Sequence, residues 1–175
     1  MTEEAFYFVD GEPCKGLWID LEVNNDEDEI KEALAAGGFI PRDEDGQPDY
    51  DGDLLVADIQ GDLTRAFYSS QLCGFDLKGF VECMEDCDRH KIDYEAAGAY
   101  MGYAGSWSLS DYEETMQGKY DSEKEFAYQY VDDIGLLGDT KNEVSMYFDY
   151  DAYARDLFVN DFYYDDDTGY VFRRN

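Results

Sequence analysis

Two cysteines and the single histidine of the chain stand at helical spacing. Cys83, Cys87 and His90 occupy positions i, i+4 and i+7, which would place them on one face of a helix. Thiolate and imidazole are ligands that zinc prefers in proteins, but a structural zinc site takes four ligands. The sequence offers no clear fourth ligand, so buried or neutral thiols are the simpler interpretation. We expect neither a metal nor a cofactor.

A second candidate cation site is an acidic loop that contains Gln47, Asp49, Asp51 and Gly52, followed by Asp58. Its spacing resembles a damaged calcium-binding EF-hand loop. The EF-hand pattern needs an aspartate at its first position and a glutamate at its twelfth, and both are missing here. A solvated acidic loop is the better interpretation. A cation-binding or hydrolytic module built on such loops is the weaker alternative.

Catalytic chemistry has little support in the sequence. Carboxylates are so numerous that no pair stands out as a general acid and base. The single histidine removes most triad chemistry, and the glycine-rich motifs that cradle phosphates are missing from the sequence. We therefore expect a protein that is not an enzyme and has no catalytic residues.

The charge of the chain is its most informative property. It has 43 Asp and Glu against 13 Lys and Arg, a formal net charge of -30 on 175 residues. Disordered acidic chains lack apolar residues, but this one is 44% hydrophobic and 17% aromatic, so it can bury a core. Because nucleic acids and anionic membranes are polyanions, neither is an expected partner. A basic protein surface or cations fit better.

Two explanations of the charge remain open at this level. One is solvation, as in an acidic housekeeping domain of a halophile's cytoplasm. The other is recognition of a basic surface, either a DNA-binding groove or another basic DNA-binding protein. Duplex DNA carries one charge per ~1.7 Å, so 43 acids at that spacing would cover roughly 73 Å, on the order of 20 base pairs. The chain thus has enough carboxylates to imitate a long stretch of DNA.

The sequence contains neither a secretory signal pattern nor an apolar run long enough for a membrane span. The four cysteines are sparse and unevenly spaced, which is typical of cytosolic thiols rather than of a disulfide framework. We therefore expect a cytoplasmic protein.

The elements that would position these residues indicate an α+β fold, built as an elongated row of small α/β subdomains. The first, residues 1–62, is a predicted β-β-α-β unit with strands at 4–9, 16–23 and 54–59 and a helix at 26–36. Asn24 and Asn25 are the expected helix caps, and an acidic loop at 42–53 follows. The second, residues 63–106, is mainly helical, with helices at 77–91 and 94–101.

The third subdomain, residues 107–175, is predicted to hold helices and a β-hairpin. Capping-box patterns begin at Ser110 and Ser122. The second opens an amphipathic helix whose apolar face we expect to run from Phe126 to Ile134. A hairpin is predicted from strands at 158–164 and 170–173, joined by Asp165-Asp-Asp-Thr-Gly169.

Three segments, taken together and in this order, resemble the ArdA family of antirestriction proteins. The first is Gly16-Leu-Trp-Ile-Asp20 with the acidic helix from Asp26 to Leu34. The second is Tyr120-Asp-Ser-Glu-Lys-Glu-Phe126 with the helix that reaches Ile134-Gly-Leu-Leu-Gly138. The third and strongest is Tyr147-Phe-Asp-Tyr-Asp-Ala-Tyr-Ala-Arg-Asp-Leu157. The resemblance covers both ends of the chain.

The resemblance implies a homodimeric DNA mimic that occupies the DNA groove of type I restriction-modification enzymes, at their methyltransferase core, and protects incoming mobile DNA. In that role surface acids would stand for phosphates. The candidates are Asp26, Glu27, Asp28, Glu29, Asp43, Glu44, Asp45, Asp132, Asp133, Asp165, Asp166 and Asp167. Core or dimer contacts would come from Tyr147, Tyr150, Tyr153 and Leu157, and Arg155 would pair with a local acid.

Overall fold

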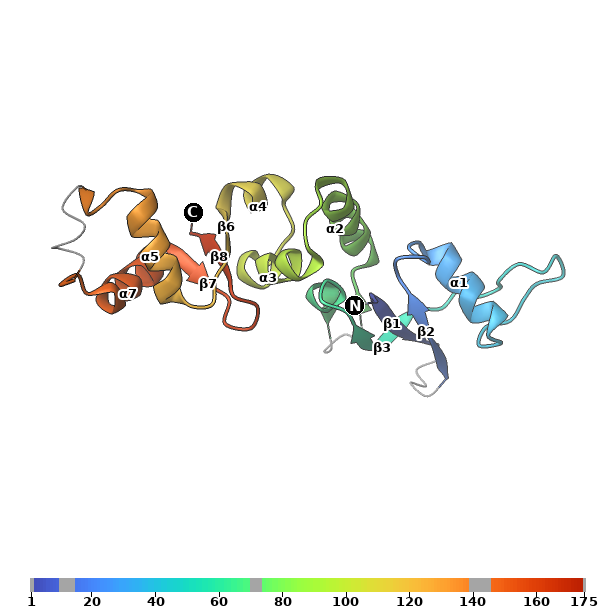
Figure 1. The fold of residues 1–175 in the computed structure, drawn as a ribbon. Coiled ribbons are helices and arrows are strands. Elements are labelled where there is room, and N and C mark those ends of the chain that lie inside the picture. Colours follow the sequence, from blue (N-terminus) through green and yellow to red (C-terminus); the bar gives the residue numbers. More distant parts are fainter. Residues whose placement is uncertain (1, 10–14, 70–73, 139–145, 175) are drawn as a thin grey trace. The chain divides into compact units, whose positions relative to one another are not determined.

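The computed structural model describes residues 2–9, 15–69, 74–138 and 146–174, and helices alternate along the chain with small antiparallel sheets (Figure 1). The predicted α+β class is therefore confirmed. Contacts divide the chain into two compact units, residues 1–102 and 103–175. Each is described by itself below. The finer division at residues 62 and 106 stays a prediction.

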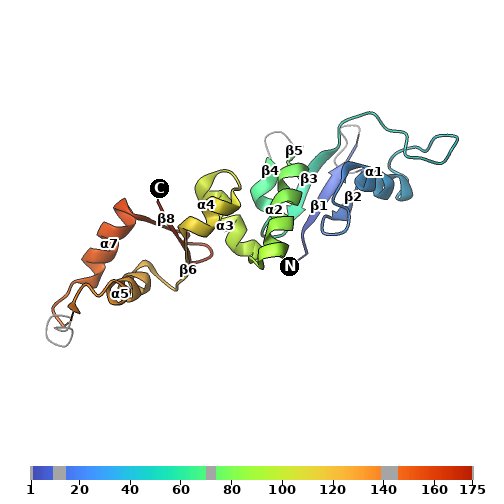
Figure 2. The same ribbon diagram turned by 90° about the horizontal axis from the view of Figure 1, so that it is seen from above.

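The first unit begins with the expected β-β-α-β order. Strands β1 (Glu4–Phe8), β2 (Gly16–Asp20) and β3 (Leu55–Gln60) form an antiparallel sheet in the order β2-β1-β3. Helix α1 (Glu27–Ala36) lies beside β2 (Figure 2). Alternate residues of β1 are buried because successive side chains in a strand point to opposite faces. Ile30 and Leu34 of α1 are fully buried as well.

The N-cap of helix α1 lies one residue after the predicted caps, Asn24 and Asn25. This N-cap is Asp26, whose carboxylate accepts a hydrogen bond from the Glu29 amide at 2.8 Å. The Glu29 carboxylate in turn accepts from the Asn25 amide at 3.0 Å. Asn24 is occupied elsewhere, since its amide group donates to the Asp20 carbonyl at 3.0 Å. The chain turns after Asp20, so the strand predicted to reach residue 23 was too long.

The rest of the first unit is mainly helical. A short 3-10 helix η1 (Thr64–Phe67) and two-residue strands β4 (Tyr68–Ser69) and β5 (Gly74–Phe75) precede α2 (Leu77–His90) and α3 (Tyr94–Ala104), and the boundary between the units falls within the last turn of α3. Asp76 caps α2 by accepting from the Gly79 amide at 3.0 Å. Phe80 of α2 is fully buried and packs edge-on against Phe67, with ring centroids 6.0 Å apart.

One acid of the first unit belongs to the core. Glu3 is 1% exposed, and its carboxylate accepts hydrogen bonds from the amides of Asp62 (3.0 Å), Leu63 (3.3 Å) and Thr64 (2.7 Å) and from the Thr64 hydroxyl. A Cβ at Gly61 would lie 2.2 Å from this carboxylate, so a larger residue would displace it. Glu3 therefore fastens the start of β1 to the segment that leads into η1.

The second unit contains α4 (Leu109–Thr115), β6 (Met116–Lys119), α5 (Glu123–Asp133), α7 (Tyr150–Asn160), β7 (Phe162–Tyr164) and β8 (Tyr170–Arg173). The strands form a sheet in the order β6-β8-β7, and β7 and β8 make the expected hairpin. The prediction that β7 begins at residue 158 was wrong, because Phe158 to Asn160 continue α7. Strand β6 was not foreseen. The core cluster consists of Phe126, Ala127, Ala154, Leu157, Phe158, Phe162 and Val171.

Of the two helix caps predicted in this unit, Ser122 is correct and Ser110 is wrong. Ser122 caps α5, accepting from the Glu125 amide at 3.1 Å, and the Glu125 carboxylate accepts from the Asp121 amide at 2.7 Å. Helix α4 is capped by Ser108 rather than Ser110. The buried face of α5 is shorter than expected, since Ile134, its C-cap residue, is 50% exposed. Helix α7 begins at its cap Asp149, which accepts from the Ala152 amide at 3.0 Å.

Candidate partner-binding surface

The residues of the two candidate cation sites differ in their exposure. Cys83 and Cys87 are fully buried with their Sγ atoms 4.0 Å apart, whereas His90 is exposed. The hydrogen bond with Cys87, then burial, raises the pKa of the Cys83 thiol and keeps it neutral. Within the described ranges, no three His, Cys, Asp or Glu residues gather as metal ligands. The acidic loop that includes Asp49 and Asp51 is exposed.

The first group of exposed acids spans two segments of the first unit. We call it the α1-loop surface and define it as Asp26, Glu27, Asp28, Glu29, Glu32, Asp43, Glu44 and Asp45. All eight are exposed. An open cleft of about 530 Å³ lies between α1 and the loop, and Asp26, Asp28, Glu29 and Glu32 line it together with Tyr50. Acids at a helix N-terminus interact favourably with the helix dipole, so those of α1 have a structural role as well.

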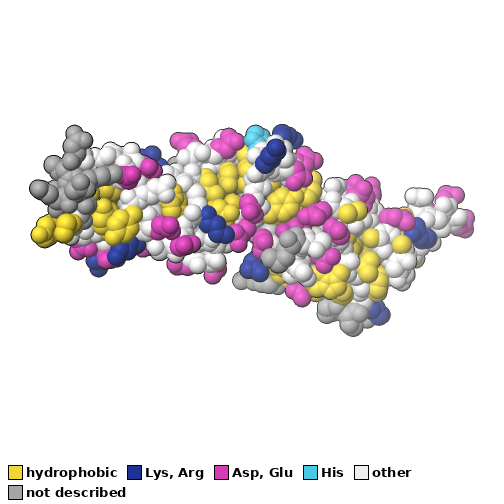
Figure 3. Space-filling model, viewed as in Figure 1, with side chains coloured by type: hydrophobic (Ala, Val, Ile, Leu, Met, Phe, Trp, Pro, Cys, Tyr) yellow, Lys and Arg dark blue, Asp and Glu magenta, His cyan; other side chains and the backbone are white. Residues whose placement is uncertain are grey.

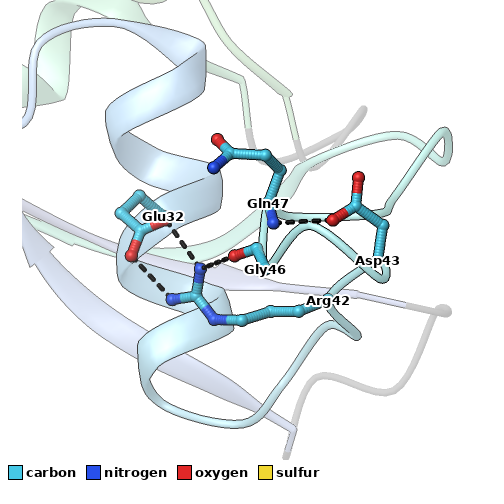
Figure 4. Close-up of polar contacts among 5 residues, drawn as sticks. All are labelled: Glu32, Arg42, Asp43, Gly46 and Gln47. Carbon is cyan, nitrogen blue, oxygen red and sulfur yellow. Dashed lines mark hydrogen bonds and ion pairs between the residues drawn. The ribbon is translucent and has the colours of Figure 1, made fainter.

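The loop part of this surface is held by one arginine (Figure 4). Arg42 donates from its two terminal nitrogens to the two carboxylate oxygens of Glu32, at 2.9 and 2.6 Å, and also to the Gly46 carbonyl at 2.8 Å. The hydrogen bond from Arg42 lowers the pKa of Glu32. The Asp43 carboxylate accepts from the amides of Asp45 (2.9 Å) and Gln47 (2.8 Å), which closes the turn.

The second group of acids surrounds the β7-β8 hairpin of the second unit. We call it the hairpin surface and define it as Asp121, Glu123, Asp165, Asp166 and Asp167. Burial, followed by repulsion from Asp166, raises the pKa of Glu123. Burial also raises the pKa of Tyr164, and Asp166 and Asp121 raise it further. Burial is the main cause of both pKa shifts, and the neighbouring acids add to it.

Asp132 and Asp133 form a third exposed acidic position, in the last turn of α5. The C-terminus of a helix carries partial negative charge, so carboxylates there oppose the dipole and cost stability. Basic residues are the stabilising choice at this position, and the last turn of α5 has none.

The predicted phosphate-mimicking acids divide by what their carboxylates do. Asp26, Glu29 and Asp43 accept backbone hydrogen bonds, and so does Asp165, which accepts from the Thr168 amide at 3.1 Å. Glu27 pairs with Lys31 at 2.6 Å. Within the described part of the chain, the carboxylates of several predicted acids make neither a hydrogen bond nor an ion pair, among them Glu44, Asp45, Asp166 and Asp167. Figure 3 shows carboxylates recurring across the visible face, with basic and hydrophobic groups between them.

Three acids of these surfaces were missed from the sequence. Glu32 stands at helical spacing from Asp28 and Glu29, so its membership of the α1-loop surface was readable from the sequence. Asp121 and Glu123 are placed beside the hairpin only by the packing of the second unit. No local pattern indicated that neighbourhood.

The predicted aromatic contacts occupy different environments. Leu157 lies in the core and Tyr153 packs against it, whereas Tyr147 is 89% exposed. Tyr150 stacks on Tyr128 with ring centroids 3.8 Å apart. Arg155 does not follow the prediction of a side-chain ion pair, since its Nε donates to the main-chain carbonyl of Asp151, one turn earlier.

These features define a class of acidic α+β protein in which exposed carboxylates, rather than a catalytic centre, are the candidate means of contact. Residues 7–172 match the sequence model of the antirestriction protein (ArdA). Because the match covers nearly the whole chain, the protein belongs to the ArdA family. Members of this family are inhibitors rather than enzymes, and their partners are restriction-modification enzymes. A comparison with curated proteins gives no match. Among the described helices, none has the length and apolarity to cross a membrane.

Proposed function

We propose that this protein is a DNA mimic that occupies the DNA-binding groove of type I restriction-modification enzymes and so protects incoming mobile DNA. The observation that carries the proposal is the presence on both units of exposed carboxylates without a folding role. Glu44 and Asp45 lie on the first unit, and Asp166 and Asp167 on the second. Asp132 and Asp133 of α5 are exposed as well, at a helix end where their charge opposes the helix dipole.

The proposed mechanism is stoichiometric inhibition. Basic side chains that hold DNA phosphates in the methyltransferase core would instead contact these carboxylates. Arginine forms paired hydrogen bonds with carboxylates as it does with phosphates, so one set of donors serves both ligands. A net charge of -30 steers the protein toward a positive groove and makes association fast and salt-sensitive.

A competition experiment tests the proposal directly. The protein is bound to a type I methyltransferase core while duplex DNA is added in increasing amounts. We expect duplex DNA to displace the protein, and added salt to weaken the complex while it stabilises the free fold. Binding that is the same with and without excess DNA would exclude mimicry. An acidic housekeeping domain would show only the stabilising effect of salt.

The hairpin surface offers a second test with a built-in comparison. Asp166→Asn with Asp167→Asn removes two charges without a known loss of hydrogen bonds, whereas Asp165→Asn also alters the acceptor that holds the Thr168 amide. Exposed charges contribute about 0.2–1 kcal/mol each, so the double variant should bind roughly two- to thirtyfold more weakly. Complete loss of binding from this pair alone would contradict a distributed surface.

We propose a homodimer formed through the second unit. Its exposed apolar side chains include Met146 (79% exposed), Tyr147 (89%) and Val159 (74%), and their burial between two copies would stabilise a dimer. Sedimentation at increasing protein concentration should show a dimer. Replacing Tyr147 and Val159 by serine should shift the protein to monomer. A parent protein that stays monomeric throughout would refute this part of the proposal.

A further inference from the structure

The segment from Arg42 to Asp53 is a strongly acidic loop with an ordered tip. It connects α1 to β3 and includes Asp43, Glu44 and Asp45 in succession. Like charges in succession repel, so a chain of this composition tends to extend and fluctuate. Here the tip is instead closed, because the Asp43 amide donates to the Gln47 carbonyl at 2.9 Å and Arg42 forms a β-bridge with Pro48.

Arg42 is the only basic residue between Lys31 and Arg65 in the sequence. Its Nη1 and Nη2 atoms donate to the two carboxylate oxygens of Glu32 on α1, and Nη1 also donates to the Gly46 carbonyl at the tip of the loop. Figure 4 shows the guanidinium between the helix and the turn. The Arg42 side chain thus connects the loop to helix α1 through Glu32 and stabilises the turn through the Gly46 carbonyl.

We infer that Arg42 is a positioning residue of the proposed DNA-mimic surface. It holds the Asp43–Asp45 turn next to α1, so that the carboxylates of Glu44 and Asp45 meet a basic partner in one arrangement. This inference rests on the proposed function. A surface that is ordered before binding loses less conformational freedom in the complex, and its affinity is higher for that reason.

The planar guanidinium explains why arginine suits this position. Two parallel hydrogen bonds to one carboxylate fix its orientation, and a further N–H remains directed at the carbonyl. A lysine ammonium can approach both acceptors as a point charge, but it does not impose that geometry. Arg42→Lys should therefore keep only part of the effect.

The chain supplies a matched control in the neighbouring pair Lys31–Glu27. That pair also joins a base to a glutamate of α1, with Nζ and Oε1 2.6 Å apart, but both residues belong to the helix and neither holds the loop. Arg42→Gln and Lys31→Gln each make the protein more negative by one charge. Coulomb attraction to a basic groove alone would make both variants bind slightly tighter.

The experiment measures the affinity of the full chain for a type I methyltransferase core, together with hydrogen exchange at the amides of Asp45 and Gln47. We expect Arg42→Gln to bind about three- to fivefold more weakly, the size of effect that one well-formed exposed ion pair supports. Both amides should exchange faster in this variant. Lys31→Gln should bind as well as the parent or better and should leave those amides unchanged.

Glu32→Gln tests the same contact from the other side. It makes the protein less negative by one charge and breaks the paired hydrogen bond, so positioning predicts that it, too, releases the turn amides to faster exchange and weakens binding. Circular dichroism checks that each variant keeps its helices. If the parent binds and Arg42→Gln binds equally well or tighter, the inference is wrong. If the parent itself does not bind the core, the proposed function fails first, and the exchange rates still decide whether Arg42 holds the turn.

Discussion

Glu3→Gln separates the local role of one acid from the net charge of the molecule. Relief of repulsion in a chain of charge -30 predicts that removing any one carboxylate stabilises the fold. Glu3 should do the opposite, because its buried carboxylate accepts four hydrogen bonds from the segment that leads into η1.

The size of the effect follows from these contacts. Glutamine keeps the shape of the side chain but replaces one acceptor oxygen with an NH2 group, which would face the donors of either Asp62 and Leu63 or Thr64. A buried donor left without an acceptor costs about 1–3 kcal/mol, and hydrogen bonds to the remaining oxygen lose their charge assistance. We expect a loss of roughly 2–4 kcal/mol in the free energy of unfolding of the first unit.

The assay is urea unfolding followed by the fluorescence of Trp18, which lies in the first unit next to Phe6. The chain has two tryptophans, so Trp107→Phe removes the signal of the second unit. Urea is preferable to guanidinium chloride because it leaves the charge unscreened. The control is Glu44→Gln, an exposed acid whose loss should change stability by no more than about 0.5 kcal/mol, in the stabilising direction. If Glu3→Gln were as stable as this control, the role of Glu3 as a fastening residue would be wrong.

Three further predictions concern other parts of the two units. Ser122→Ala removes the α5 cap and should cost ~1 kcal/mol of unfolding free energy in thermal or urea melts, whereas Ser122→Asp should keep the stability. Phe80→Ala should cost about 3–5 kcal/mol in the same melts because the side chain is fully buried; a loss below 1 kcal/mol would contradict that packing. Burial, then Glu27, raises the pKa of Tyr7 above its unfolded value near 10, so its contribution to stability is complete below about pH 10 and is lost as the pH rises further. Tyrosinate absorbance should then rise together with alkaline unfolding, and Tyr7→Phe should delay it.

The parts of the fold that local patterns specify were predictable. The β-β-α-β order, helices α2 and α5 and the β7-β8 hairpin each follow from periodicity, turn residues or a capping box, and the structure has them. The errors lie where two local signals compete. Phe158 has the character of a strand residue, yet packing of its side chain in the core cluster keeps it in α7. Strand β6 is short and polar, and its pairing with β8 is a tertiary contact that no window of sequence shows.

For the candidate site, the sequence indicated the acids but not how they divide. That Asp45 is exposed and Asp43 closes a turn depends on backbone amides whose positions are set by the loop. The buried role of Glu3 depends on residues about sixty positions away in the chain. Composition treats all these carboxylates alike, and only their hydrogen bonds distinguish those that fold the chain from those available to a partner.

The aspartate caps of α1, α2 and α7 have a consequence for how selection on this protein is measured. Asp26, Asp76 and Asp149 each begin a helix by accepting an amide hydrogen bond. Asparagine caps a helix about as well as aspartate, so the capping hydrogen bond itself does not require a charge, and the charge of aspartate adds only its interaction with the helix dipole. The frequency with which relatives keep Asp rather than Asn there would record how strongly negative charge is favoured once the capping hydrogen bond is provided by either residue. The ratio of Asp to Asn at these three caps thus measures a preference for negative charge, which most acidic surface positions cannot do because they have no equivalent neutral residue for comparison.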